Sequence, residues 1–197
     1  RHILEHAHDT QGFINSVNKL VKPNGYLVFE VPDCTKAMEN YDYSCPWEEH
    51  VLYFTPETLQ RALAISEMPL VSYVSYPYSL EDSLVAIVRP SADSQPVGEI
   101  SPVSAEELER ITEYADALGR NQDKFQSYFS EYRRKHGKVG LLGAGHLACT
   151  FVNLLGLKDQ FEFIVDDNPN KCGLFLPGSG LSIIAPGSLV SEDIKLC

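Results

Sequence analysis

The sequence lacks the features that mark membrane proteins and disulfide-stabilised proteins. No stretch approaches the run of about eighteen apolar residues that a transmembrane helix needs, and the opening residues "RHILEHAHD" contain no apolar segment of the signal-peptide type. The five cysteines, at positions 34, 45, 149, 172 and 197, form no CxxC pair. Their spacing disfavours a cysteine zinc site and a disulfide framework, and predicts a reducing, cytoplasmic environment with no membrane association.

Basic residues are also scarce. The chain has 16 Lys and Arg against 27 Asp and Glu, a formal net charge of −11. This balance argues against a nucleic-acid partner, because neutralising phosphates requires a basic face. It leaves room for a small-molecule partner, which needs only a few local donors. With 197 residues, of which 44% are hydrophobic, the chain can form one large globular domain or two small ones.

The first half of the chain predicts an α/β fold. In "DTQGFINSVNKLVKPNGYLVFEVPD", apolar residues recur at helical spacing over about residues 10–22, and "KPNG" then stops the helix. "YLVFEVP" is a short, almost continuously apolar run, typical of a strand buried on both faces of a parallel sheet. Helix, glycine turn and buried strand together indicate a unit of a doubly wound sheet.

The middle of the chain predicts two further strands and two groups of helices. "TPETLQRALAIS" begins a helix, with Thr55 as N-cap and Pro56 in the first position. "LVSYVSYPYS" and "SLVAIVRP" indicate an antiparallel pair at a sheet edge, and "SADSQPVGEISPVS" a linker. A capping box from Ser104 to Glu107 opens a long helical stretch with a break near Gly119. The predicted divisions are residues 1–95, 96–136 and 137–197.

A glycine loop opens the last third of the chain. Gly143, Gly145 and Ala148 have the G-x-G-x-x-A pattern between a predicted strand and a helix, and Asp166 ends the next strand. This context fits a dinucleotide fingerprint, in which the acid binds a ribose. It fits equally a contact to an anion or substrate at a helix start. A third interpretation is that small residues merely let strand and helix pack closely.

Two polar clusters are further candidates for a site. "DDNPNKCGLFLPG" begins with Asp166, Asp167 and Asn168 at a strand end, where α/β sheets bind ligands, although a polar turn has the same composition. In "SCPWEEHVLYFTPETL", Glu49 stands beside His50, and a carboxylate next to an imidazole suits proton transfer. Taken by itself, this stretch is more often a surface turn, and His6, after Glu5, is more often structural.

The order of these motifs resembles a known family. "HILEHAHDTQGFINSVNKLVKPNGYLVFEVPD" resembles the second half of a class I methyltransferase domain that uses S-adenosylmethionine (SAM). "EEHVLYFTPETL" resembles a stretch of the sugar C-methyltransferases, which methylate a carbon of nucleotide-linked 4-keto-deoxysugars. "FIVDDNPNKCGLFLPGSGLSIIAP", with the preceding glycine loop, resembles the Rossmann-like C-terminal domain that follows such methyltransferases. The implied fold is the end of a doubly wound methyltransferase sheet followed by a small Rossmann-like α/β domain.

The resemblance also implies catalytic roles. His50 is the expected base that removes the proton next to a ketone, Glu49 is its neighbour, and His6 is a second imidazole facing the sugar. The resulting enolate then attacks the methyl group of SAM. Trp47 and Tyr53 are expected to line the substrate pocket, although the family often has Tyr where this chain has Trp47. An indole cannot act as an acid or base as a phenol can, so the step assigned to that Tyr does not transfer.

The remaining implications concern ligands. The resemblance assigns substrate contacts in the C-terminal domain to Gly143, Gly145, His146, Asp166, Asn168 and Lys171, and a nucleotide-sugar as the partner. The family's SAM loop and its N-terminal zinc module lie upstream of the matched region, so the chain is expected to be a fragment that is inactive by itself. The main alternative is an NAD(P)- or nucleotide-binding oxidoreductase module that uses Gly143, Gly145 and Asp166. A non-catalytic assembly domain is a third alternative.

Overall fold

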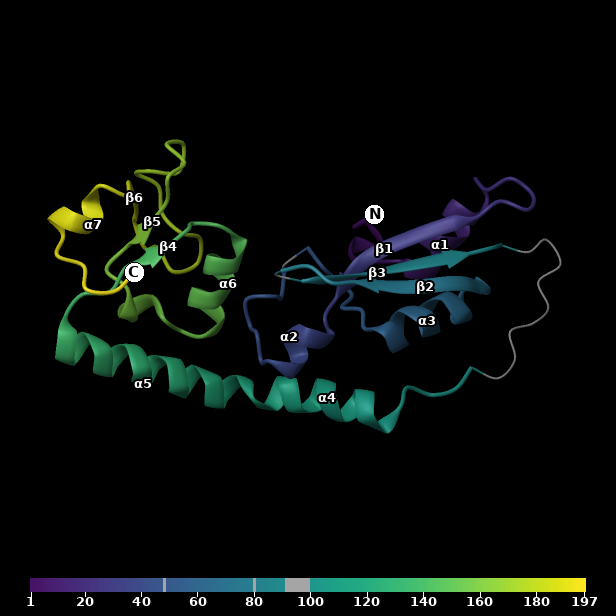
Figure 1. Ribbon diagram of the computed structural model, residues 1–197, viewed down its shortest axis with the longest axis horizontal. Helices are drawn as coiled ribbons and strands as arrows, with labels where there is room; N and C mark the ends of the chain where they lie inside the picture. Colours follow the sequence, from purple (N-terminus) through teal and green to yellow (C-terminus); the bar gives the residue numbers. More distant parts are fainter. Residues whose placement is uncertain (48, 80, 91–99) are drawn as a thin grey trace. The chain divides into compact units, whose positions relative to one another are not determined.

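A computed structural model describes residues 1–47, 49–79, 81–90 and 100–197 (Figure 1). The chain forms two compact units. The N-terminal unit comprises Arg1–Asn40 and Glu48–Glu113, and the C-terminal unit comprises Tyr41–Trp47 and Tyr114–Cys197. Most of the predicted linker, residues 91–99, falls outside the described residues. The prediction of a mixed α/β fold is confirmed, because the chain holds one antiparallel and one parallel three-stranded sheet among several helices.

The N-terminal unit is built around the antiparallel sheet, in the strand order β1-β3-β2. The elements of this part of the chain are the short 3-10 helix η1 (Leu4–His6), α1 (Thr10–Asn18), β1 (Leu27–Asp33), α2 (Thr35–Glu39), α3 (Pro56–Ile65), β2 (Leu70–Tyr76), β3 (Asp82–Val88) and α4 (Ala105–Asp116), which extends past Glu113. The predicted antiparallel pair is confirmed as β2 and β3. The pair lies at the edge of this sheet, with β2 outermost and β3 between β2 and β1.

The prediction that β1 is buried on both faces of a parallel sheet is wrong for the described strands. β1 pairs antiparallel with β3, and Val31 lies opposite Leu84. The face that carries these two residues packs against α1 and α3 in one apolar core, whereas Val28 on the other face is 56% exposed. A continuous apolar run makes a strand favourable, but it says nothing about the direction of the neighbouring strand.

The predicted start of α3 is confirmed, whereas α1 ends earlier than its apolar pattern predicts. Thr55 and Thr58 form a reciprocal capping box, and Pro56 begins α3. α1 ends at Asn18 instead of near residue 22, because the chain then closes into tight turns at Leu20 and Val21. These turns satisfy the last carbonyl groups of the helix, so an apolar residue beyond its end does not extend it.

The predicted capping box of α4 forms only in part. The Ser104 hydroxyl accepts a hydrogen bond from the Glu107 N–H at 3.1 Å. The buried Glu107 carboxylate does not reach back to Ser104; it accepts from the Thr55 hydroxyl at 2.6 Å and pairs with Arg110. Ser104 instead donates its N–H and its hydroxyl to Glu57, which holds the pKa of Glu57 below its ordinary value. The Glu57 carboxylate, from another helix, therefore replaces the Glu107 carboxylate as the acceptor at Ser104.

The C-terminal unit contains the parallel sheet, in the order β4-β5-β6. Its elements are α5 (Leu118–His136), β4 (Leu141–Leu142), α6 (His146–Leu154), the 3-10 helix η2 (Lys158–Gln160), β5 (Ile164–Val165), β6 (Ile183–Ile184) and α7 (Ser188–Ser191). The predicted succession of strand, glycine turn, helix and two further strands is confirmed. The predicted helix break occurs at Ala117, two residues before Gly119.

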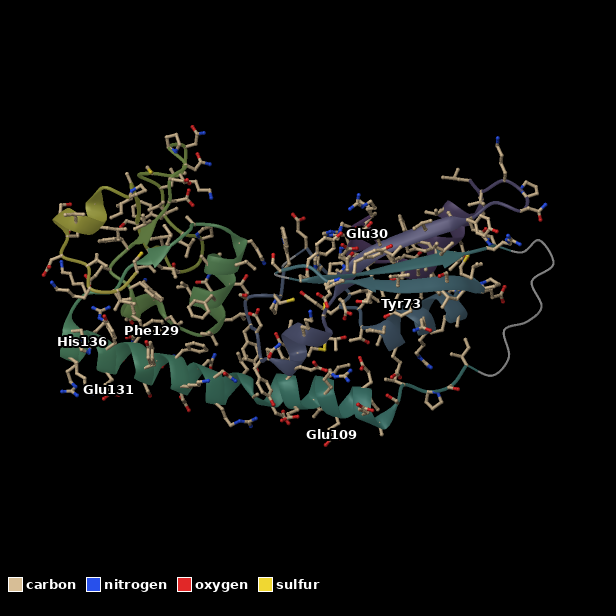
Figure 2. All side chains as sticks on the ribbon, viewed as in Figure 1. Glu30, Tyr73, Glu109, Phe129, Glu131 and His136 are labelled. Atoms are coloured by element: carbon tan, nitrogen blue, oxygen red, sulfur yellow. The ribbon has the colours of Figure 1, made fainter. Side chains whose placement is uncertain are left out.

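The long helix α5 packs against this unit along one side. Figure 2 shows Phe129 on the side of α5 toward the rest of the unit and Glu131 on the opposite side. The Phe129 ring contacts Phe161 in the core at a centroid distance of 5.1 Å. This amphipathic arrangement accounts for a stable helix of 19 residues. None of the helices in the described ranges combines the length and the apolar composition that crossing a bilayer requires.

Candidate active site

Two histidines meet in the N-terminal unit. The rings of His6 and His50 lie 4.7 Å apart between centroids and are inclined at 78°. His6 belongs to η1, and His50 lies in the loop before α3. The backbone carbonyl of Glu5 accepts from the N–H of Val51 at 2.9 Å and of Leu52 at 3.2 Å. These bonds hold η1 against the loop that carries His50, so the contact of the two imidazoles is built into the backbone.

The hydrogen bond of His6 determines its tautomer. Its Nδ1 lies 3.0 Å from the carbonyl oxygen of Glu49. A carbonyl oxygen can only accept, so Nδ1 carries the proton and Nε2 retains the lone pair. Glu49 thus contacts His6 through its backbone, while its side chain is exposed. The Tyr53 ring lies 6.1 Å from that of His50.

Glu5 is a residue of this cluster that the sequence reasoning missed. It is 1% exposed, and neither carboxylate oxygen has a hydrogen-bond partner in the described structure. Its Oε1 lies 3.5 Å from Nδ1 of His2. The signal was present in "ILEH", where an acid directly follows two apolar residues, but only the tertiary structure shows that this acid is buried.

A second aromatic pair forms within the C-terminal unit. The Trp47 indole stacks on the His146 imidazole, with centroids 4.3 Å apart and an angle of 15°. His146 donates from Nε2 to the carbonyl of Pro46 at 3.1 Å, and Thr150 donates to the same carbonyl at 3.3 Å. The segment Tyr41–Trp47 is therefore bound to the start of α6. Neither Pro46 nor Thr150 was among the predicted site residues, since a backbone carbonyl leaves no sequence signal.

Asp166 organises the loops at the ends of the parallel strands. Its Oδ2 accepts from the Ala144 N–H at 2.7 Å and from Lys171 Nζ at 3.1 Å, and its Oδ1 accepts from the Asn168 N–H at 2.9 Å. These donors, with the Ala144 N–H first, hold the pKa of Asp166 below its ordinary value. A carboxylate with three donors in place ties the glycine loop to the next loop. This arrangement weakens the alternative in which Asp166 binds the ribose of a dinucleotide.

The glycine loop remains open above the start of α6. Gly143 has a φ of +93°, which explains the glycine there, whereas Gly145 has an ordinary extended conformation. A methyl group added at either position would meet no atom within 4 Å. The loop therefore leaves space beside the first N–H groups of α6, where an anionic group could bind. Asn168 uses its side chain to accept from the Asn170 N–H at 3.0 Å, as in a tight polar turn.

Each unit brings some of the predicted site residues together. His6, the Glu49 carbonyl, His50 and Tyr53 gather in the N-terminal unit. In the C-terminal unit, Trp47 joins His146, and Asp166 joins Lys171 and Asn168 beside the glycine loop. Their assignment to catalysis or substrate binding stays a prediction.

Comparison with known families assigns both parts of the chain. Residues 1–66 match the family model described as a methyltransferase domain. Residues 99–195 match the model described as a C-methyltransferase C-terminal domain. No curated protein matches the chain.

The chain therefore combines a methyltransferase domain with a C-methyltransferase C-terminal domain. The family resemblance predicted from the motifs is confirmed. The match over residues 99–195 includes the glycine loop.

Proposed function

We propose that this protein is a SAM-dependent C-methyltransferase. Its acceptor would be the carbon next to the ketone of a nucleotide-linked keto-deoxysugar or a related keto substrate. The two family matches support the class of reaction. The observation that carries the chemistry is the contact between His6 and His50, which places two imidazoles within one cluster of the methyltransferase domain.

The acceptor must first be made nucleophilic. In the proposed step, a ring nitrogen of His50 removes a proton from the carbon next to the ketone. The electrons of the broken C–H bond form the enolate, and the negative charge develops on the ketone oxygen. A histidine is suited to this transfer because its unperturbed pKa lies close to neutral pH. Stabilising the enolate oxygen is the main electrostatic requirement of the reaction.

The surrounding residues hold the imidazoles for this task. The Glu49 carbonyl fixes the His6 ring in one tautomer, and the Glu5 carbonyl fixes the loop that follows His50. Exact placement of a base contributes strongly to rate, because a small displacement removes the reacting geometry. Tyr53, beside His50, is proposed as a wall of the acceptor pocket.

The methyl donor would be SAM, which supplies a methyl group to the nucleophilic carbon. Within residues 1–66, glycine occurs only at positions 12 and 25. Gly12 lies inside α1 and Gly25 lies in the turn before β1, so neither forms a glycine-rich loop between a strand and a helix. We therefore assign none of these residues to SAM.

The C-terminal domain is proposed to bind the acceptor's nucleotide. The open loop at Gly143 and Gly145 precedes the N-terminus of α6, where N–H groups favour phosphate. His146 directly follows this loop, and Asn168 and Lys171 lie in the loop after β5, which Asp166 ties to the glycine loop. Lys171 is the cationic member of this group, although it also pairs with Asp166.

The test measures methyl transfer by the full-length protein. Radiolabelled SAM is supplied with a panel of nucleotide-linked 4-keto-deoxysugars, and labelled product is separated and counted. His50→Gln is expected to reduce turnover by about 10²–10⁴-fold, the usual contribution of a positioned base. His136→Gln, on the exposed end of α5, is the matched control and is expected to leave turnover unchanged.

A second readout isolates the proton transfer. Without SAM, the protein in deuterated water is expected to exchange the proton next to the ketone, and His50→Gln is expected to abolish this exchange. Labelled product from none of the acceptors would contradict the proposed substrate class. Undiminished exchange in His50→Gln would contradict the assignment of the base.

A further inference from the structure

The buried carboxylate of Glu5 is compensated only in part by the described residues around it. Its side chain is 2% exposed, and both oxygens have no hydrogen-bond partner among the described residues. An ionised carboxylate in such a place is strongly unfavourable unless a cation or several donors face it. His2 lies 3.5 Å from Glu5, but it stands equally close to Glu30 and is half exposed, so it compensates the buried charge only in part.

Two imidazoles face the same carboxylate. One ligating atom each from Glu5, His6 and His50 can be chosen so that all three lie within 4.8 Å of one another. The proton on Nδ1 of His6 is used by the Glu49 carbonyl, which directs the lone pair on Nε2 to another partner. Metal-binding histidines commonly have this arrangement, with the second nitrogen held by a carbonyl.

We propose that Glu5, His6 and His50 form a binding site for a divalent transition-metal ion, with Zn²⁺ as the ion that fits best. Two imidazole nitrogens and one carboxylate oxygen are a recurring zinc ligand set, with the fourth position left to water or substrate. Imidazole ligands disfavour Mg²⁺ and Ca²⁺, which prefer oxygen. Bonds of about 2.0–2.2 Å in a tetrahedral site bring ligand atoms to about 3.4 Å, so the side chains move inward by roughly an ångström or more.

The backbone supports this site. Glu5 and His6 are neighbours in η1, and the Glu5 carbonyl binds the N–H groups that follow His50. The third ligand is thereby held close to the first two, although it is distant in the sequence. Zinc ligand spacing in a sequence cannot reveal a site of this kind, and the scattered cysteines play no part in it.

The site shares His50 with the proposed reaction, but metal binding does not rest on that reaction. A ring nitrogen bound to Zn²⁺ has its lone pair engaged and cannot remove a proton. If both proposals hold, excess Zn²⁺ inhibits methyl transfer, and a chelator restores it.

Binding is tested on the purified chain without methyl donor or acceptor. After chelator treatment, Zn²⁺ is titrated calorimetrically, and Co²⁺ is titrated by visible absorption as a spectroscopic probe. One ion per chain is expected. Glu5→Gln, which preserves size, and His50→Gln are each expected to weaken binding by more than tenfold. His8→Ala and His136→Ala, both exposed histidines, are the controls and are expected to leave the affinity unchanged.

Folding and ligand type are checked in the same samples. Zn²⁺ is expected to raise the melting temperature of the unmodified chain and of both controls, but not of Glu5→Gln or His50→Gln. If one of these two variants does not fold, the other decides. The proposal is overturned by lack of stoichiometric binding, by binding that Glu5→Gln and His50→Gln leave intact, or by a thiolate-to-cobalt charge-transfer band, which would place the ion on cysteine.

Discussion

Replacing Tyr43 by alanine is expected to destabilise the C-terminal unit strongly. Tyr43 is buried in the core of that unit, although it lies in the short segment Tyr41–Trp47, far in sequence from the rest. Its hydroxyl donates to the Tyr114 carbonyl at 2.6 Å, and the two rings stack with centroids 4.7 Å apart. Burial also raises the pKa of the Tyr43 hydroxyl. Tyr43 thus anchors the segment Tyr41–Trp47 to the core of the C-terminal unit.

The magnitude follows from these contacts. Truncating a buried aromatic side chain to alanine costs about 3–5 kcal/mol, and the lost hydrogen bond adds about 1 kcal/mol. The sum, about 4–6 kcal/mol, is a large part of the total stability of about 5–15 kcal/mol that is typical of a domain. Tyr43→Phe keeps the ring and loses only the hydrogen bond, so it is expected to cost about 1 kcal/mol.

The assay is urea unfolding followed by the fluorescence of Trp47, the single tryptophan, which belongs to the same unit. Circular dichroism supplies a second probe of the same transition. Tyr128→Ala is the control, because Tyr128 is 55% exposed on α5, and its cost is expected to stay within about 0.5 kcal/mol. Equal midpoints for Tyr43→Ala and Tyr128→Ala would refute the placement of Tyr43 in this core.

Three further predictions concern the C-terminal unit. Folding lowers the pKa of Asp166, so its contribution to stability is present above its ordinary pKa of 3.8 and is lost as pH falls through the lower folded-state pKa. Asp166→Asn is therefore expected to lower the melting temperature at neutral pH and to flatten the dependence of the melting temperature on pH in the acid range. An unchanged pH profile would contradict this role. Gly143→Ala is expected to lower the free energy of unfolding by about 1–2 kcal/mol, because Gly143 has a positive φ. Gly145 lies in open, extended backbone, so Gly145→Ala is expected to change it by no more than about 0.5 kcal/mol. Equal urea midpoints for the two variants would show that the conformation at Gly143 carries no cost. His146→Ala removes the ring stacked on Trp47, so the fluorescence emission of Trp47 is expected to shift to longer wavelength. His146→Phe keeps an aromatic ring in the stack and is expected largely to preserve the spectrum. Identical spectra for His146→Ala and the unmodified chain would contradict the stacking.

Local sequence patterns predicted much of the fold. The cap of α3 at Thr55 was correct because its signals act over a few residues. The capping box at Ser104 formed only in part, because the carboxylate that accepts from its N–H belongs to Glu57, distant in sequence, and not to Glu107. The predicted parallel pairing of β1 was also wrong, because the direction of the neighbouring strand depends on how the whole chain folds back.

The candidate site also has features that the sequence predicted and features that only the structure shows. Residue types such as His50 beside Glu49 could be found in the sequence, because their chemistry is intrinsic to the side chains. The hydrogen-bond partner of His6 could not be found in the sequence, because it is the backbone carbonyl of Glu49 and not the Glu49 carboxylate. The buried state of Glu5 was equally hidden, because burial is a property of the surroundings.

The sequence by itself determined that the chain is α/β, and its motifs identified the methyltransferase and C-methyltransferase C-terminal domains. Periodicity, caps and short motifs are local, so they can be read along the chain. Only the tertiary structure decided that η1 lies against the His50 loop and that Tyr43 and Trp47 belong to the C-terminal unit. Such contacts join residues far apart in sequence, and they form because burial and hydrogen bonding are satisfied across the whole chain at once.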